Sequence, residues 1–108
     1  MYRKEKLESI IHEELSKLIK RHIDTNAIIT ITSVVLSKKL DEGTIWVAIL
    51  PEEKEENTLA LLKRNVGKLR HFLLKKLTIR VVPHLTFKID AGAKNAAVVE
   101  EALLKRNN

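Results

Sequence analysis

The chain of 108 residues carries a formal net charge of +6 and contains no cysteine. This length is common for one domain, which can bury its core without cross-links. The lack of cysteine excludes disulfides and cysteine-ligated zinc or iron–sulfur centres. The longest apolar run, Ile45–Leu50, is far too short to cross a bilayer. We therefore expect a single cytoplasmic domain over residues 1–108, with no targeting segment and no place in a membrane.

The first predicted element is an amphipathic helix over roughly 3–22. Residues 27–38 follow and are mostly β-branched, which is typical of a strand. Residues 41–43 are predicted to turn the chain, and 44–50 to form the return strand of a hairpin that ends at Pro51. The apolar residues of the helix recur every three or four positions, opposite a face of mixed charge; they are Leu7, Ile10, Ile11, Leu15, Leu18 and Ile19.

An acidic loop over 52–56 and a second helix from Thr58 to about Lys76 come next. Thr58 suits the N-cap position, and the acidic residues before it suit the helix dipole. One face of this helix is apolar and is predicted to lie in the core: Leu59, Leu62, Val66, Leu69 and Leu73. Roughly opposite lies a basic ridge whose spacing matches a row of phosphates, made of Arg64, Lys68, His71 and Lys75.

The tripeptide Asn65-Val66-Gly67 interrupts the middle of this helix. Glycine costs about 1 kcal/mol of helix stability relative to alanine, so we predict a kink there. Gly67 would let a phosphate approach the backbone, and Asn65 tolerates unusual backbone angles. The alternative explanation is that Gly67 allows close packing against the sheet.

Residues 79–89 are predicted to form the third strand. Pro83 has no N–H to donate, so this strand should lie at a sheet edge or break at that point. The last residues, 91–108, are expected to be a partly frayed tail or a short helix. Alternation in the strand predicts an apolar side that faces the core and a polar side opposite it. The apolar side consists of Ile79, Val81, Leu85, Phe87 and Ile89. The polar side consists of Arg80, His84, Thr86 and Lys88.

The positive charge is concentrated in one segment. Residues 57–89 hold eight Lys or Arg and no Asp or Glu, whereas 1–56 hold nine basic and eleven acidic residues and 90–108 hold three of each. A one-sided basic surface favours a polyanion, most commonly nucleic acid. The alternative is a basic helix face that is merely solvated.

At this point the residues resemble a known family, ribosome-binding factor A. The specific part is the run Arg-x-x-Pro-x-Leu-x-Phe-x-x-Asp from Arg80 to Asp90, preceded by Gly67-x-x-Arg70-x-x-Leu73. The resemblance covers nearly the whole chain. Other matching positions follow in the same order: Arg3, Lys6, Leu7, Ile31–Val34, Ser37, Leu40 and Leu77–Ile79.

The resemblance implies an α+β, type II KH-like domain in the order helix-strand-strand-helix-kink-helix-strand, with helices on one face of a three-stranded sheet. Ordinary KH domains grip nucleic acid with a Gly-x-x-Gly loop. In place of that loop, the resemblance implies an Ala-x-Gly kink between two helices. The matching positions in this chain are Asn65, Val66 and Gly67. Asn therefore replaces Ala here, and Lys39 stands where members usually carry Asp.

The implied function is ribosome biogenesis: binding of the small-subunit precursor and 16S rRNA to assist rRNA processing and late 30S maturation, notably in the cold. We expect a monomer with no cofactor. Recognition should follow RNA shape, because the aromatic residues Trp46, Phe72 and Phe87 are assigned to the core or sheet surface. The predicted RNA-binding residues are Arg64, Asn65, Gly67, Lys68, His71, Lys75, Lys76, Arg80 and Lys88.

Two other classes of function compete with this interpretation. An enzyme would need acid–base groups, and the candidates His12, His22, His71 and His84 lack the context of a nucleophilic triad, a metal-ligand pair or a phosphate-binding loop. We therefore expect no catalysis and no metal site. The other class is a general RNA-binding or protein-binding adaptor that uses the same basic face.

Arg70 is expected to be structural, because it lies near the edge of the apolar stripe and not on the basic ridge. We hypothesise that it anchors its helix to the end of the third strand through a carboxylate or backbone carbonyls. Asp90 is the nearest carboxylate by motif.

Overall fold

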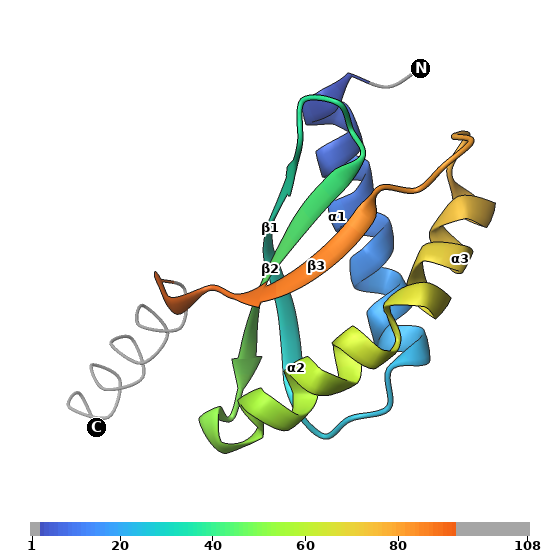
Figure 1. Cartoon of the computed structure of the whole chain (residues 1–108). Helices are drawn as coiled ribbons and strands as arrows, with labels where there is room; N and C mark the ends of the chain where they lie inside the picture. The colour runs from blue at the N-terminus through green and yellow to red at the C-terminus, as the bar shows by residue number, and fades with distance from the viewer. Residues whose placement is uncertain (1–2, 93–108) are drawn as a thin grey trace.

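The structure, a computed structural model, describes residues 3–92 (Figure 1). The elements follow the predicted order, including a break between the second and third helices. The expected tail or short helix over 91–108 lies almost wholly outside the described residues. The elements are α1 (Lys4–His22), β1 (Ile28–Leu36), β2 (Glu42–Leu50), the 3₁₀ turn η1 (Glu52–Lys54), α2 (Glu55–Arg64), α3 (Val66–Lys76) and β3 (His84–Ile89).

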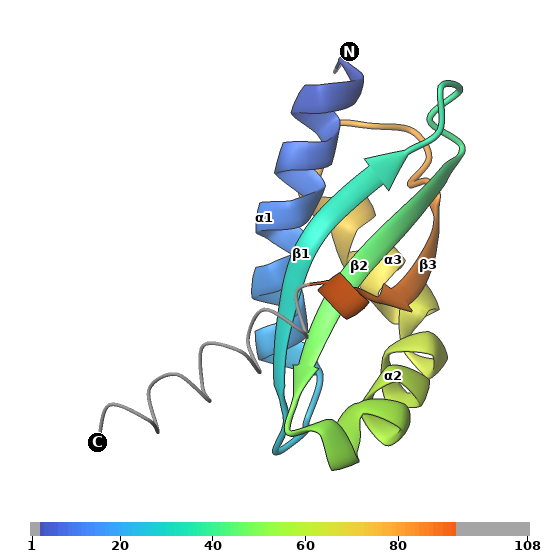
Figure 2. The same ribbon diagram turned by 90° about the vertical axis from the view of Figure 1, so that its left-hand side faces the viewer.

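The three strands form one sheet in the order β1-β2-β3. β1 and β2 are antiparallel, with a bulge between Ile31 and Ser33, whereas β2 and β3 are parallel. A parallel pair needs a crossover connection, and α2 and α3 provide it. Within the described residues, α1, α2 and α3 all cover one face of the sheet and none covers the other, as comparison of Figures 1 and 2 shows.

The core lies between the sheet and the three helices. Alternate residues of β2 face the helices, and Ile45, Val47 and Ile49 are almost fully buried. Burying such a side chain contributes about 1.5–3 kcal/mol, so the apolar stripes hold the helices onto the sheet. The predicted stripe positions that are buried include Leu7, Ile11, Leu15, Leu18 and Ile19 of α1, and Leu62, Leu69 and Leu73 of α2 and α3.

The hairpin turn lies earlier than predicted, because Glu42 and Gly43 already belong to β2. The loop closes through Ser37, whose Oγ donates to Asp41 Oδ1 at 2.6 Å and accepts from the Glu42 N–H at 3.1 Å. Gly43 is therefore not a turn residue. Its role is spatial, since a Cβ there would lie 2.8 Å from Cδ2 of the buried Leu36.

The helix α2 also begins earlier than predicted. Pro51 is followed directly by the turn η1, and the helix starts at Glu55, so most of the expected acidic loop is helical. Glu55 and Glu56 lie in the first turn, where a carboxylate is favoured by the helix dipole. Thr58 is not the N-cap; it lies inside the helix and is buried.

The third strand is shorter than predicted, because β3 begins only at His84. The alternation is wrong before Pro83: Val81 is 74% exposed, whereas Val82 is buried. Pro83 cannot donate to a ladder, and the carbonyls of Val82 and Pro83 bind a side chain of α3. The predicted break at Pro83 and the edge position of the strand are confirmed.

Candidate nucleic-acid interface

The break between α2 and α3 is centred on Asn65, whose φ of −100° and ψ of 7° depart from helical values. Its N–H is shared between the carbonyls of Leu61 and Leu62, and its Nδ2 donates to the Leu61 carbonyl at 2.8 Å. Its own carbonyl accepts from the Leu69 N–H at 3.0 Å. An asparagine that bonds to the backbone of its own helix competes with regular helix geometry, so one residue ends α2 and starts α3.

Gly67 lies in the first turn of α3 and is exposed. A Cβ at this position would have no atom of another element within 4 Å. The close-packing explanation for this glycine is therefore wrong. Because Gly67 has no side chain, the backbone at this position is open to a ligand.

Arg70 holds the segment before β3 against α3. Its Nε donates to the Pro83 carbonyl at 3.0 Å, and its Nη2 donates to the Val82 carbonyl at 2.7 Å. The suggested partner Asp90 is wrong, because the six residues of β3 place it about 20 Å from Pro83. Asp90 instead accepts from the Thr32 hydroxyl at 2.6 Å. The structural role through backbone carbonyls is confirmed.

Arg70 and Val82 form one wall of a hollow of about 280 Å³, which we call the α3 groove. Leu74 and Val81 present exposed apolar surface in it, and Arg80 and His71 present polar groups. Apolar side chains beside cations suit the bases and phosphates of RNA. The groove is lined by Gly67, Arg70, His71, Leu74, Arg80, Val81 and Val82.

The basic ridge runs beside the α3 groove and shares His71 with it. Its four members, Arg64, Lys68, His71 and Lys75, are all exposed. Of the ridge, His71 lines the α3 groove with Gly67 and Arg80, Lys68 lies near His22 at the end of α1, and Arg64 lines a separate hollow with Thr25 and Asn26. This arrangement offers cations along a helix and an open backbone at its start, which together suit a phosphate chain.

Two of the predicted RNA-binding lysines lie elsewhere. Lys76 turns toward α1, where its Nζ lies 3.7 Å from Glu14 Oε2. Lys88 is exposed on the open side of the sheet, paired with Trp46 in the β2–β3 ladder. Alternation within β3 places Lys88 on the sheet face that points away from the helices. Lys88 and the ridge therefore cannot bind the same stretch of RNA backbone.

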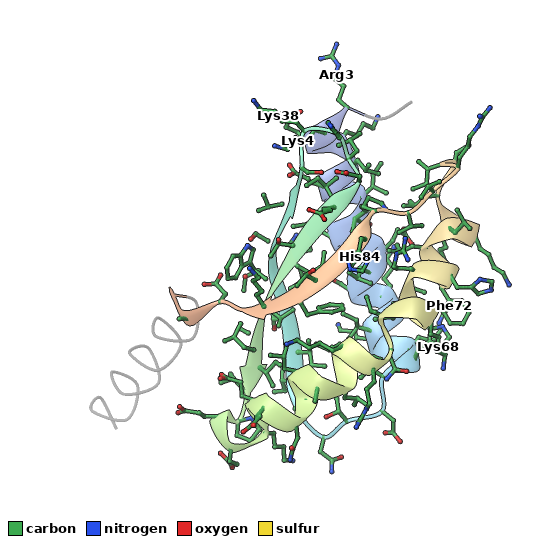
Figure 3. All side chains as sticks on the ribbon, in the orientation of Figure 1. Arg3, Lys4, Lys38, Lys68, Phe72 and His84 are labelled. Atoms are coloured by element: carbon green, nitrogen blue, oxygen red, sulfur yellow. The ribbon has the colours of Figure 1, made fainter. Side chains whose placement is uncertain are left out.

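The end of α1 joins the ridge surface, which no local sequence pattern predicted. The His22 ring stacks on Phe72 with centroids 4.1 Å apart and planes 5° from parallel, and Phe72 and Lys68 lie together on α3 (Figure 3). Partial desolvation, followed by the Lys68 and Arg21 cations, lowers the pKa of His22 below its ordinary value. Helical periodicity could not have paired residues so far apart in the sequence.

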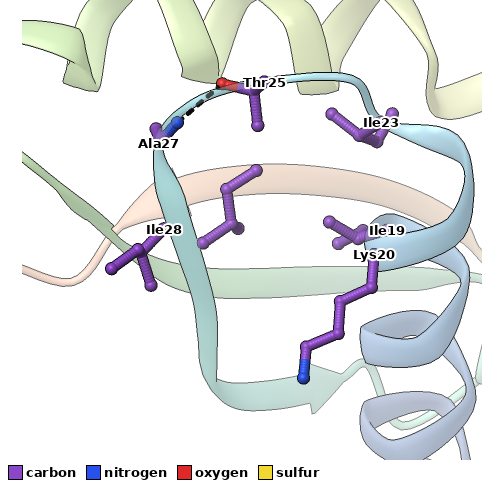
Figure 4. Close-up of a pocket in the computed structure, with 7 residues that line it drawn as sticks. Ile19, Lys20, Ile23, Thr25, Ala27 and Ile28 are labelled. Atoms are coloured by element: carbon purple, nitrogen blue, oxygen red, sulfur yellow. Dashed lines mark hydrogen bonds between the residues drawn. The ribbon is translucent and has the colours of Figure 1, made fainter.

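Two further features lie away from this surface. Arg3, Lys4 and Lys38 gather where α1 begins and the hairpin turns (Figure 3). A hollow of about 290 Å³ between the end of α1 and the start of β1 is lined mainly by apolar side chains, with Lys20 as the charged group among them (Figure 4). Neither feature joins a row of cations to an open backbone as the α3 groove does.

Within residues 3–92, no three His, Cys, Asp or Glu side chains are placed to hold a metal ion. Over the same range, no helix combines the length and apolar character needed to span a bilayer. Of the candidate acid–base histidines, His71 lines the α3 groove and His22 stacks on Phe72, whereas His12 and His84 lie elsewhere on the surface.

Comparison with known proteins gives one family. Residues 3–103 match the family model described as ribosome-binding factor A. A curated relative, ribosome-binding factor A of Coxiella burnetii (strain Dugway 5J108-111), is 28% identical over 109 residues, covering 95% of this chain and 92% of that protein.

Solved structures agree with this match. The crystal structure of ribosome-binding factor A from Thermus thermophilus superposes with a TM-score of 0.74 at 27% identity, covering 81% of this chain and 94% of that chain. A Thermus thermophilus homology model, fitted into the cryo-EM map of a 30S–RbfA complex, gives a TM-score of 0.66 at 26% identity, covering 77% and 90%. The fold is therefore the KH-like fold expected from the sequence.

Proposed function

Because this chain belongs to the ribosome-binding factor A family, we propose that it binds the precursor of the small ribosomal subunit. There it contacts 16S rRNA and assists processing and late maturation, a role that is important in the cold. It acts in the cytoplasm as a monomeric single domain, without catalysis and without a cofactor. A relative of similar fold has been fitted into a 30S complex, which supports the choice of partner.

The observation that carries this proposal is the α3 groove beside the basic ridge. Gly67 leaves backbone open at the start of α3, and Arg80 lines the same groove from the segment before β3. The segment 57–89 that supplies these groups has no carboxylate to repel a phosphate. Lysine and arginine contacts to phosphates give affinity and orientation, whereas RNA shape selects the site.

The direct test is to sediment a lysate through a gradient and follow the protein. We expect it to travel with small-subunit precursors, and to leave those fractions when the RNA is digested before sedimentation. Absence from the small-subunit fractions at low salt would contradict the proposal. Association that survives complete digestion would instead favour the adaptor, in which the basic face meets an acidic protein.

A further inference from the structure

The open face of the sheet lies opposite the α3 groove, and among residues 3–92 no helix covers it (Figure 2). Its central rows follow from the strand register: Ser33, Trp46 and Lys88 lie side by side, and Val35, Thr44 and Thr86 form the next row. Every one of these side chains is partly or fully exposed. The face therefore presents an aromatic ring at its centre, surrounded mostly by hydroxyl and apolar groups.

Near Trp46 this face carries one cation, Lys88, and one carboxylate, Asp90. Lys88 Nζ lies 5.9 Å from the centre of the indole ring, and β3 contains no carboxylate between His84 and Ile89. Of the acidic neighbours, Asp90 accepts from the Thr32 hydroxyl and Glu42 lies two rows away, paired with His84. A phosphate near Trp46 would thus meet a cation.

We propose that this open face is a second RNA-binding site, at which an unpaired base stacks on Trp46 while Lys88 contacts the adjoining phosphate. An aromatic ring on an exposed sheet with a cation beside it is a general solution for single-stranded nucleic acid, because every base has a face to stack and every nucleotide has a phosphate. The bound nucleotide would displace the Lys88 ammonium from its place over the ring toward the phosphate.

This site differs in kind from the α3 groove. The groove and ridge offer four or more cations to an RNA backbone, whereas the open face offers one aromatic ring and one close cation. Affinity here should depend on stacking and only weakly on salt. The inference rests on the proposed function for the choice of RNA as ligand. The two surfaces lie on opposite sides of the sheet, so one site can fail while the other binds.

The single tryptophan of the chain makes the test specific. The full chain is titrated with an eight-nucleotide oligouridylate and an eight-nucleotide oligoadenylate while tryptophan emission is recorded. We expect saturable quenching, because a stacked base quenches indole fluorescence only at contact. Binding of the same oligonucleotides, labelled and followed by anisotropy, should weaken roughly 5- to 100-fold in Trp46→Leu, the effect typical of losing one stacking ring.

Three variants separate the possible outcomes. Trp46→Phe keeps a ring and should retain most of the affinity, and Lys88→Gln should weaken binding and reduce its salt dependence by about one unit of slope. Replacing Arg64, Lys68, Lys75 and Arg80 by alanine should leave the quenching in place, so failure of the ridge and failure of this site are distinguishable. Circular dichroism verifies that each variant is folded.

Unchanged emission at saturating oligonucleotide would overturn the proposal. So would equal affinity of Trp46→Leu and the parent chain. Emission that changes with protein concentration in the absence of RNA would show that a second copy of the chain covers this face, and this result would also overturn it.

Discussion

The two halves of the molecule use their charges differently. In residues 3–56, charged side chains serve the fold: Glu8 Oε2 accepts from the Leu36 N–H at 2.8 Å, and Lys17 lies 3.5 Å from Glu13 and 3.6 Å from Glu14. In residues 57–89 there is no carboxylate to serve as a local partner. Arg70, which clamps two carbonyls, and Lys76, which lies 3.7 Å from Glu14 of α1, are exceptions there.

This difference separates charge that holds the protein together from charge that is available to a ligand. An exposed ion pair contributes about 0–1 kcal/mol, so the half with both signs of charge gains little stability from them. Because those charges largely cancel, this half also produces only a weak electrostatic potential in the solvent. A half with cations alone suffers self-repulsion but attracts a polyanion. The following predictions test that division, from the largest expected effect to the smallest.

The largest effect is expected from the basic half. Replacing Arg64, Lys68, Lys75 and Arg80 together by alanine should weaken binding to small-subunit precursors and lower the slope of log K against log salt by about three units, since each lost phosphate contact removes about 0.7–0.9. The slope is measured by filter binding or anisotropy from low to high salt.

A matched control removes the same number of cations from the balanced half: Lys17, Lys20, Lys38 and Lys54, all replaced by alanine. Its slope should change much less. Equal loss in both quadruple variants would mean that total charge, and not its placement, decides binding.

Arg70 tests one of the two exceptions in the basic half. Arg70→Ala should destabilise the fold by about 2 kcal/mol, because two charge-assisted hydrogen bonds to the Val82 and Pro83 carbonyls are lost. Arg70→Lys keeps the charge but cannot reproduce the forked geometry, so it should recover only part of the loss. Urea unfolding measures both. If Arg70→Lys restores stability fully, charge alone is sufficient and the clamp geometry is unimportant.

Glu8 is the corresponding residue in the balanced half. Glu8→Ala should cost about 1–1.5 kcal/mol, because the Leu36 N–H at the edge of β1 loses a charged acceptor. Glu8→Gln retains an acceptor and should cost less. Neither change should alter RNA affinity once corrected for the folded fraction; a clear loss of affinity would place Glu8 near the ligand.

Gly67 should show stability and binding moving in opposite directions. Because the Cβ of Gly67→Ala enters open space, helix stability should rise, by up to about 1 kcal/mol. RNA affinity should nevertheless fall, since the methyl group covers backbone in the α3 groove. Thermal unfolding and RNA binding are measured on the same preparation. A variant that is stabilised and binds as tightly as the parent would show that no phosphate approaches Gly67.

The smallest effect concerns His22. Its pKa lies below the ordinary 6.5, through partial desolvation and the Lys68 and Arg21 cations. The unfolded chain therefore takes up the proton first, so the contribution of neutral His22 to stability is present above pH 6.5 and is lost as the pH falls through the lower folded value. In Lys68→Ala, an NMR titration should show the His22 midpoint moving upward. An unchanged midpoint would mean that Lys68 does not act on this ring.

Much of the candidate site could be predicted from the sequence, because its parts lie on one continuous segment. Helical spacing placed Lys68, His71 and Lys75 along the exposed side of α3, and the propensities of Asn65 and Gly67 located the break that separates them from Arg64 on α2. The edge position of β3 followed from Pro83, which cannot donate to a ladder.

The predictions that the structure contradicts concern places where two elements meet. Val81 is exposed although alternation predicted it for the core, because Arg70 binds the Val82 and Pro83 carbonyls and alternation continues only where a ladder is paired. Lys88 is predicted to bind RNA like the ridge residues, although the sheet separates it from them. The stacking of His22 on Phe72 has no counterpart in any local pattern.

By itself, the sequence determined which side of its own helix or strand each residue lies on, and in which half of the chain the uncompensated positive charge resides. These properties are local, since they follow from a repeat of 3.6 or 2 residues and from composition. Only the tertiary structure decided which sides face one another: that α1 ends beside α3, that Arg80 joins Gly67 in one groove, and that Trp46 and Lys88 share an open face. Those juxtapositions arise from the crossover between parallel β2 and β3 and from the burial of apolar stripes, which couple residues far apart in the chain.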